Sequence, residues 1–368
     1  MPGQSGALLS SNGASHVTLS GIKFDGLERR LGERNELVHF ENAQRLKISD
    51  CEFVNAGGAA LHLFASDGEI TGNHFDNIDT AIHSLDAHGL AVAGNIISGA
   101  ANNGIQVWRS EQGDDGTIVA GNRIENVANR SGGSGQYGNA VNIFRAGNVI
   151  VRGNHIANCA FSAVRGNAAS NLHIDGNNVT DVREVALYAE FGFEGVVITG
   201  NSVDGAAIGV SVTNFNHGGR LAVVQGNLIR NLLSQRPSGT DPNDGAGIGI
   251  AVEADSSVVG NTIEDAPYVG MSLGYGRYLR DVAATGNVVR RAGYGVTVSV
   301  SVSVSVSVSV SVSVASGAGS ALIANNMLAE CARGAIVGMD HGRVVTGDLM
   351  RAGSENFPQL TLGTNATR

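Results

Sequence analysis

Proline, cysteine, aromatic residues and charge are all scarce in this chain of 368 residues. It has 5 prolines and 3 cysteines, only 5% of its residues are aromatic, and 15% are charged. Three cysteines far apart in the sequence predict small buried side chains in preference to a disulfide framework or a metal site. The formal net charge of −9 argues against a nucleic-acid partner, because phosphate-binding surfaces gather Lys and Arg on one face.

Long apolar segments are also missing. The chain has no run of about 18 apolar residues, the length at which a membrane span is predicted. The first residues, MPGQSGALLSSNG, lack the charged and then apolar pattern of a secretory signal. We therefore expect no membrane span, and we expect that a leader, if the protein is exported, lies outside this sequence.

Glycine is abundant, with 52 copies, and it recurs next to asparagine inside one template, apolar-x-apolar-x-Gly-Asn-x-apolar. EITGNHF and IVAGNRI are two instances. The asparagines of the template are Asn73, Asn95, Asn122, Asn154, Asn177, Asn201, Asn227, Asn261 and Asn287. Most successive copies are 22 to 26 residues apart, and weaker copies lie at 17–24, 46–53 and 321–328. A repeat of this length indicates about twelve stacked units.

Each unit holds strand patterns and turns without a helical period. A second strand, such as AIHS at 81 or AVNI at 140, follows most Gly-Asn pairs after 8 or 9 residues. This arrangement predicts an all-β chain, a single right-handed parallel β-helix over residues 1–368. Gly supplies the positive φ of a corner, and stacked Asn side chains predict an amide ladder, so we assign these residues to structure.

Polar and aromatic side chains occupy the outward positions of the second strands. The third position gives His62, His83, Gln106, Asn142, Arg165, Tyr188 and Ser211, and the fifth gives Phe64, Leu85, Trp108, Phe144, Asn167, Glu190 and Thr213. The next position adds Asp86, Arg109, Arg145 and Asn214. Stacked parallel strands place equivalent residues about 4.8 Å apart. We therefore expect a continuous track of these side chains along the outer face.

Two units carry insertions at the same corner. The distance from Asn122 to the strand at Ala140 is 18 positions, and the distance from Asn227 to Gly247 is 20. Four coils of about 4.8 Å each separate the insertions by roughly 19 Å. Insertions in repeat proteins often map to the binding face, although surface loops also tolerate neutral insertion. We take the coils between the two loops as the candidate site.

A track of rings, amides and arginines suits a polysaccharide, because rings stack on sugars and Arg binds carboxylates in bidentate fashion. The catalytic candidates are Arg165, Tyr188 and Glu190, and the substrate-binding candidates are Trp108, Arg109, Asn142, Phe144, Arg145, Asn167 and Asn214. Elimination or epimerisation of an acidic sugar fits a base with an Arg better than hydrolysis does, since hydrolysis needs two carboxyl groups. Whether the chain is an enzyme stays open at this point.

The alternatives are a non-catalytic scaffold and a metal-delivery module. A solvent-facing strand must be polar in any case, and an Arg165–Glu190 contact would then be a surface pair of under about 1 kcal/mol. Two histidines, His62 and His83, make a poor metal site without a third ligand, so we assign no metal site. Calcium at Asp114-Asp115 or at Asp241 and Asp244 is a further option, but Asp beside Gly more often forms turns, so we expect no cofactor.

The stretches NNGIQVWRSEQGDDGT, NRSGGSGQYGNAVNIFRAGNVIVRGN and EVALYAEFGFEG resemble bacterial twin-arginine-translocated repetitive proteins, which are predicted β-helices of unknown biochemistry. The resemblance runs from about Ser20 to Asp348, and it implies export to the periplasm or cell envelope and a chain that is truncated at its N-terminus relative to the family. It brings no catalytic residues. More broadly the units are similar to pectate-lyase-like β-helices, although the acidic clusters of polygalacturonases are missing.

Two segments depart from the repeat. The Val-Ser alternation at 298–314 is far longer than one coil edge, so we expect an insertion that protrudes as a loose hairpin and carries an aggregation risk. Residues 349–368 have no clear template, and we expect a tail or a last partial coil.

Overall fold

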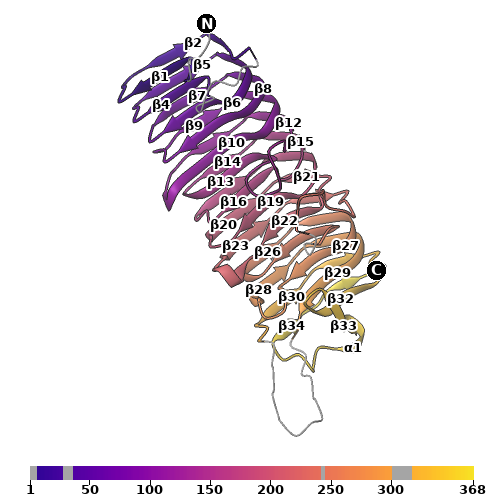
Figure 1. Cartoon of the computed structure of the whole chain (residues 1–368). Coiled ribbons are helices and arrows are strands. Elements are labelled where there is room, and N and C mark those ends of the chain that lie inside the picture. The colour runs from indigo at the N-terminus through magenta and orange to yellow at the C-terminus, as the bar shows by residue number, and fades with distance from the viewer. Residues whose placement is uncertain (1–5, 28–35, 242–244, 301–316) are drawn as a thin grey trace.

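The computed structural model describes residues 6–27, 36–241, 245–300 and 317–368. The chain winds into one elongated stack of parallel strands, with the N-terminus at one end and the C-terminus near the other (Figure 1). Two sheets of 22 and 13 strands run along the whole stack. In the described part of the chain, no helix combines the length and the apolar character that crossing a membrane would require.

The 13-stranded sheet holds the strand that precedes each Gly-Asn corner. Its members are β2 (Thr18–Ser20), β5 (Leu46–Ser49), β7 (Gly68–Thr71), β9 (Ala91–Ala93), β11 (Ile118–Ala120), β14 (Ile150–Arg152), β17 (Leu172–Asp175), β20 (Glu194–Thr199), β23 (Arg220–Gln225), β26 (Ala254–Val259), β28 (Arg280–Thr285), β30 (Ala321–Ala324) and β34 (Leu360–Leu362).

The 22-stranded sheet forms the rest of each coil. Its members are β1 (Leu9–Asn12), β3 (Lys23–Asp25), β4 (Val38–Glu41), β6 (Glu52–Phe64), β8 (His74–Leu85), β10 (Ile96–Asp114), β12 (Arg123–Val127), β13 (Asn139–Gly147), β15 (His155–Cys159), β16 (Val164–Asn167), β18 (Asn178–Val182), β19 (Val185–Glu190), β21 (Ser202–Asp204), β22 (Ile208–Val212), β24 (Leu228–Arg230), β25 (Ile248–Val252), β27 (Thr262–Leu273), β29 (Val288–Ser299), β31 (Met327–Ala329), β32 (Gly334–Asp340), β33 (Arg343–Asp348) and β35 (Ala366–Thr367).

A coil therefore has three strand segments, one more than the two that the sequence pattern indicated. The extra segment is the short strand directly after Gly-Asn, such as β12. It is only three to five residues long in most coils, so the sequence template did not distinguish it as a separate strand. A residue with positive φ, for example Asn126 at 61° or Asn158 at 53°, lies next to the last residue of this strand and bends the chain toward the third segment. The fold is all-β, as predicted.

The predicted asparagine ladder is present and lies inside the stack. Asn177 donates from Nδ2 to Oδ1 of Asn201 at 3.0 Å and to the carbonyl oxygen of Val151 at 3.0 Å, and its backbone N–H donates to the same Oδ1 at 2.9 Å. The same pattern repeats along Asn73, Asn95, Asn122, Asn154, Asn177, Asn201, Asn227, Asn261, Asn287, Asn326 and Asn365. Glycines such as Gly121, with φ 63°, make the corner that aims each amide inward.

The interior is filled by columns of equivalent apolar side chains. Phe53 stacks on Phe75 with ring centroids 4.8 Å apart and an interplanar angle of 7°, and Phe24 stacks on the other side of Phe53 at 5.1 Å. Branched aliphatic residues continue this column, beginning with Ile97 and Ile124. Burial of one such column per strand segment holds the coils in register, because a slip by one residue would turn each apolar set outward.

The C-terminal end departs from the parallel pattern. β32 and β33 form an antiparallel hairpin, the one antiparallel pair of named strands in the described ranges. The short helix α1 (Leu349–Ala352) follows, and then β34 and β35 return to the stack, where Asn365 joins the asparagine ladder. Residues 355–368 thus contain a further partial coil.

The Val-Ser tract begins inside a regular strand. Val298 and Ser299 pair with Gly338 and Met339 of β32, and Val300 donates its N–H to the carbonyl oxygen of Met339 at 2.9 Å. These first residues of the alternation belong to a coil. Residues 301–316, where a protruding hairpin was predicted, lie outside the described residues.

Candidate functional site

The outward positions of the third strand segments are in register along the stack, as predicted. The pairs Asn142–Arg165, Arg165–Tyr188 and Tyr188–Ser211 are direct partners on neighbouring strands. The line extends at both ends to give His39, His62, His83, Gln106, Asn142, Arg165, Tyr188, Ser211, Ala251, Ser272 and Thr297, which we call the track. One strand face therefore presents these side chains in a single row.

The two inserted loops meet above the middle of the track. They leave the stack at β12 and β24, as the sequence analysis placed them, but they do not stand apart. The N–H of Ser134 in the first loop donates to the carbonyl oxygen of Gly239 in the second at 3.2 Å. Phe161 is fully buried, and the side of its ring lies against both loops at Gly138 and Gly239. The loops thus cover the coils that they were expected to flank.

A buried chain of charges lies under this cover. Arg165 Nε and Nη2 donate to the two carboxylate oxygens of Glu190 at 2.7 and 2.9 Å, and Nη1 donates to Glu184 at 3.2 Å. Arg236 of the second loop reaches the other oxygen of Glu184 at 2.9 Å, and Asn167 donates to Glu190 at 2.9 Å. Arg165 is 7% exposed and Glu190 is 2% exposed. The surface pair considered in the sequence analysis is in fact a buried bidentate pair, because the loops exclude water from it.

The charges of this network compensate one another. Burial alone lowers the pKa of the Arg165 guanidinium, but the carboxylates of Glu190 and Glu184 outweigh it, and the pKa is raised above its ordinary value. Arg165 also lies 4.9 Å from the centre of the Tyr188 ring. Arg165 is charged and its three nitrogens are committed to neighbouring carboxylates. A network of this kind fixes the loop cover in place.

The other predicted binding residues divide between the cover and the N-terminal part of the track. Asn142 is buried; it accepts from Trp108 Nε1 at 3.2 Å and donates to the carbonyl oxygen of Gly135 at 2.7 Å. Trp108 and Phe144 are half-buried and meet edge to face with centroids 6.0 Å apart. Arg145 lies over the Phe144 ring and donates to the carbonyl oxygen of Ser110 at 2.6 Å. Arg109 donates to the carbonyl oxygen of Ala87 at 3.2 Å.

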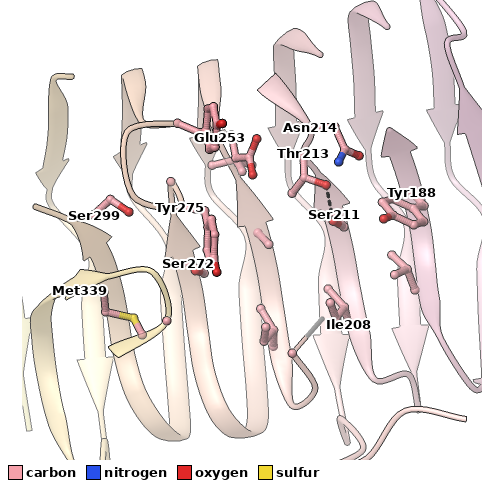
Figure 2. A pocket seen from close by; sticks show the side chains of 18 of the residues that line it. Tyr188, Ile208, Ser211, Thr213, Asn214, Glu253, Ser272, Tyr275, Ser299 and Met339 are labelled. Atoms are coloured by element: carbon pink, nitrogen blue, oxygen red, sulfur yellow. Dashed lines mark hydrogen bonds between the residues drawn. The ribbon is translucent and has the colours of Figure 1, made fainter. Parts of the chain in front are cut away.

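An open groove of about 510 Å³ begins where the loop cover ends. Its floor is the track from Tyr188 through Ser211 and Ala251 to Ser272, whose residues pair on neighbouring strands. Figure 2 shows Tyr188, Ser211 and Ser272 on this floor. One wall is apolar and is made by Val185, Ile208, Ile248 and Tyr268. The opposite wall is polar and is made by Thr213, Asn214, Asn216, Glu253, Tyr275 and Tyr278. Arg236 and Gly245 close one end of the groove, and Met339 and Gly342 of the C-terminal hairpin close the other.

Neighbouring side chains hold the tyrosines of the groove. Tyr275 is 49% exposed, and the ring of His341 supports it edge to face at a centroid distance of 5.2 Å. Tyr268 packs against Tyr294 at 6.1 Å, and its hydroxyl contacts Met339 Sδ at 3.9 Å. The groove therefore offers fixed aromatic rings to solvent, which the covered part of the track does not.

Glu253 is the one carboxylate among the described residues that line this groove. Its Oε2 accepts from the backbone N–H of Phe215 at 2.7 Å. Burial raises the pKa of the Glu253 carboxyl to about 7, although the backbone hydrogen bonds from Phe215 and Asn214 act to lower it. A carboxyl group with this pKa is able to give or take a proton near neutral pH.

Of the predicted site residues, only Tyr188 and Asn214 line the groove. Glu253, Tyr268, Tyr275 and Tyr278 were missed. Continuing the row of outward positions beyond Ser211 to the strands at 248–252 and 270–273 would have found the floor. The two tyrosines of the YGRY segment at 275–278 were the sequence signal for the polar wall. The contribution of loop residues to a groove, by contrast, has no signature in the repeat.

Metal-type ligands gather at the opposite end of the track. Glu36, His39 and His62 place one ligand atom each within 4.8 Å of one another. The calcium candidates have other partners: Asp114 accepts from Asn148 at 2.8 Å, and Asp115 accepts from the backbone N–H of Thr117 at 3.1 Å in a turn. Asp244 lies outside the described residues. Cys51, Cys159 and Cys331 are free thiols, the first two buried as expected and the third half-buried.

The comparisons with known proteins concern the fold. A family model for a right handed beta helix region matches residues 5–135. No curated protein sequence matches the chain. The N-terminal fragment of gene product 12 of bacteriophage phi29 matches with a TM-score of 0.56 at 14% identity, over 91% of this chain and 57% of that one. The chain thus spans little more than half the length of this relative.

Two further solved structures are more distant. They are the catalytic unit of a thermostable GH87 alpha-1,3-glucanase from Streptomyces thermodiastaticus, at 13% identity and a TM-score of 0.43, and the catalytic domain of a GH87 alpha-1,3-glucanase variant in complex with nigerose, at 11% and 0.49. They cover 99% and 97% of this chain, which spans 63% of each of them. Likenesses at these scores carry no argument about activity. From its strands and from the family model, the chain is a right-handed parallel β-helix.

Proposed function

We propose that this chain binds a polysaccharide in the groove that runs from Tyr188 to Met339. The observation that carries the proposal is the pairing of an apolar and aromatic wall with a wall of hydroxyl, amide and carboxyl groups over a floor in strict register. Sugars have the same two-sided chemistry, since their ring faces stack on aromatic side chains and their hydroxyls take hydrogen bonds.

The repeat of the coils supports a polymer as the ligand. Neighbouring strands lie about 4.8 Å apart, so each step along the floor offers equivalent backbone geometry with a new side chain. An extended sugar chain lying along the stack would meet Tyr188, Ser211, Ala251 and Ser272 in turn. Rings held by neighbours, such as Tyr275 on His341, lose little side-chain freedom when a ligand binds.

Modification of the bound sugar is the second candidate, and Glu253 is the observation that favours it. A carboxyl group with a pKa of about 7 in the groove suits proton transfer in elimination or epimerisation of an acidic sugar. In elimination the base takes a ring proton beside the uronate carboxylate, a carbon–carbon double bond forms, and the departing sugar oxygen takes a proton. Hydrolysis is less well supported, because it usually uses two carboxyl groups about 5–9.5 Å apart and Glu253 stands alone among the described groove residues.

Binding is tested by a glycan array followed by calorimetry on the polysaccharides that bind. We expect Tyr275→Ala to weaken binding by about tenfold or more, the loss of an aromatic contact of about 1.5 kcal/mol. Phe191→Ala is the matched control, because Phe191 is also exposed and aromatic but does not line the groove. The proposal fails if no glycan binds or if both variants bind as the wild type does; a non-catalytic scaffold is then the better account.

Modification has a separate assay. Incubation with uronate polymers should produce the ultraviolet absorbance of an unsaturated uronate if elimination occurs, and a change in the sugar's proton spectrum if epimerisation occurs. Glu253→Gln should abolish either signal and leave binding in place. Activity that survives this substitution would remove Glu253 from the reaction.

The location of the protein is proposed from the family resemblance alone. The likeness to twin-arginine-translocated repetitive proteins suggests that the chain works in the periplasm or cell envelope, where a polysaccharide or another envelope component is the partner. Fractionation of cells that produce the protein from its own gene tests this proposal, and recovery of the mature chain in the cytosol alone would contradict it.

A further inference from the structure

Three ligand-type side chains converge at the N-terminal end of the track. His39 on β4 and His62 on β6 are partners in register, and Glu36 lies in the segment that leads into β4. The Nδ1 atoms of His39 and His62 are 3.2 Å apart, and His62 Nδ1 is also 3.2 Å from Glu36 Oε1. All three ligand atoms lie within 4.8 Å of one another.

Hydrogen bonding leaves this cluster poorly satisfied. His62 Nδ1 carries at most one proton, yet it lies at hydrogen-bond distance from both an imidazole nitrogen and a carboxylate oxygen. In addition, His62 Nε2 and Glu36 Oε2 are buried and have no hydrogen-bond partner among the residues that the structure describes. Buried polar atoms are nearly always paired, and a cation between the three side chains would satisfy both the shared His62 Nδ1 and the Glu36 carboxylate.

Two separations between the ligand atoms fit those around a tetrahedral metal ion. Bonds of about 2.0–2.1 Å from Zn²⁺ to nitrogen and oxygen ligands put neighbouring ligand atoms roughly 3.3 Å apart. Two of the three separations, the contacts of 3.2 Å, match this value; the third is within 4.8 Å, so binding would draw Glu36 and His39 toward the ion. We propose that Glu36, His39 and His62 bind a divalent transition-metal ion, for which Zn²⁺ is the best match to two imidazoles and one carboxylate.

The surroundings hold the imidazoles in place. His83 stacks on His62 with centroids 4.7 Å apart and an interplanar angle of 10°, and Trp108 meets His83 edge to face at 5.2 Å. This aromatic column fixes the ring plane of His62 on one side of the cluster. Three protein ligands leave the fourth tetrahedral position for water or for a group of a bound molecule.

The proposed metal site is independent of the proposed groove. Five coil steps, or about 24 Å, separate His62 from Tyr188 along the track. The sequence pattern offered only His62 and His83, which lacked a third ligand. The structure supplies His39 from the coil before and Glu36 from the segment that enters it.

Equilibrium dialysis of the whole chain against Zn²⁺, followed by metal analysis, tests the site. We expect about one ion per wild-type chain, and binding weaker by more than about tenfold in His62→Ala and Glu36→Gln, because even the loss of a partner outside the ligand shell costs that much. His173→Ala is the control, since His173 is an exposed histidine on β17. Co²⁺ should give the intense visible bands of a tetrahedral site in the wild type and in the control.

Glu36→Gln keeps the size of the side chain. It therefore tests the metal site even if His62→Ala does not fold. In thermal unfolding, Zn²⁺ should raise the Tm of the wild type and of His173→Ala but not that of Glu36→Gln. The inference is wrong if the wild type binds no metal, or if Glu36→Gln binds Zn²⁺ as tightly as the wild type does.

Discussion

The covered and open parts of the track use the same strands for opposite purposes. In the covered part, Asn142, Arg165 and Glu190 are buried under the two inserted loops; Asn142 bonds to the first loop, and Arg165 bonds to Glu190 and Glu184. From Ser211 to Ser272 the same strand positions form the floor of an open groove. The strand register decides where a side chain stands, and the loops decide whether a ligand can reach it.

The largest effect should come from breaking the buried network. Arg165→Ala would leave Glu190 and Glu184 without their shared cation, and we expect a loss of about 3–5 kcal/mol in the free energy of unfolding. Denaturant unfolding monitored by circular dichroism measures it. A loss under about 1 kcal/mol would mean that the pair behaves as an exposed one and that the cover does not exclude water.

We expect a smaller loss in the free energy of unfolding when the second loop is detached from the network. Arg236→Ala removes the hydrogen bond to Glu184 but leaves Arg165 with both carboxylates, so we expect a loss of about 1–3 kcal/mol. Limited proteolysis should then cut within residues 128–138 faster than in the wild type, because the two loops hold each other. Unchanged proteolysis would show that this residue does not hold the cover.

In the open part, Glu253 should make the free energy of unfolding depend on pH. The folded pKa of Glu253 is raised to about 7 from an ordinary 4.5, so the folded state binds the extra proton and stability falls as pH rises from about 4.5 through 7. Glu253→Gln should remove roughly 2 kcal/mol of this decline, since one pKa unit is about 1.4 kcal/mol and the side chain is partly exposed. Parallel pH–stability curves for the two chains would contradict the assignment.

The smallest effect on stability is expected at the groove surface. Tyr275→Ala and Ser272→Ala should change the free energy of unfolding by no more than about 0.5 kcal/mol, because neither side chain is fully buried. The contrast with Arg165→Ala sharpens the comparison between the two parts. A loss above about 2 kcal/mol at Tyr275 would make that residue part of the scaffold.

The repeat was enough to predict the fold, the asparagine ladder and the register of the track. Each Gly-Asn corner depends on a positive φ at Gly and on the Asn amide beside it. Both are local in the sequence, and the coils repeat them. The sequence also placed both insertions. It did not reveal that Ser134 and Gly239 meet, or that Arg236 reaches Glu184, because contacts between loops of different coils follow no period. Glu253 follows Val252, the partner of Val212, and was missed because the row of outward positions was not continued past Thr213. Its burial depends on the loop at Phe215, which no repeat predicts.

Hydroxyl-radical footprinting with mass spectrometry tests most directly whether the loops close one part of the track and leave the other open. In the wild type, Tyr275 should be oxidised readily while Phe161, fully buried against the loops, stays protected. In Arg236→Ala, Phe161 should become reactive while Tyr275 is unchanged. Equal oxidation of Phe161 and Tyr275 in the wild type would contradict this account.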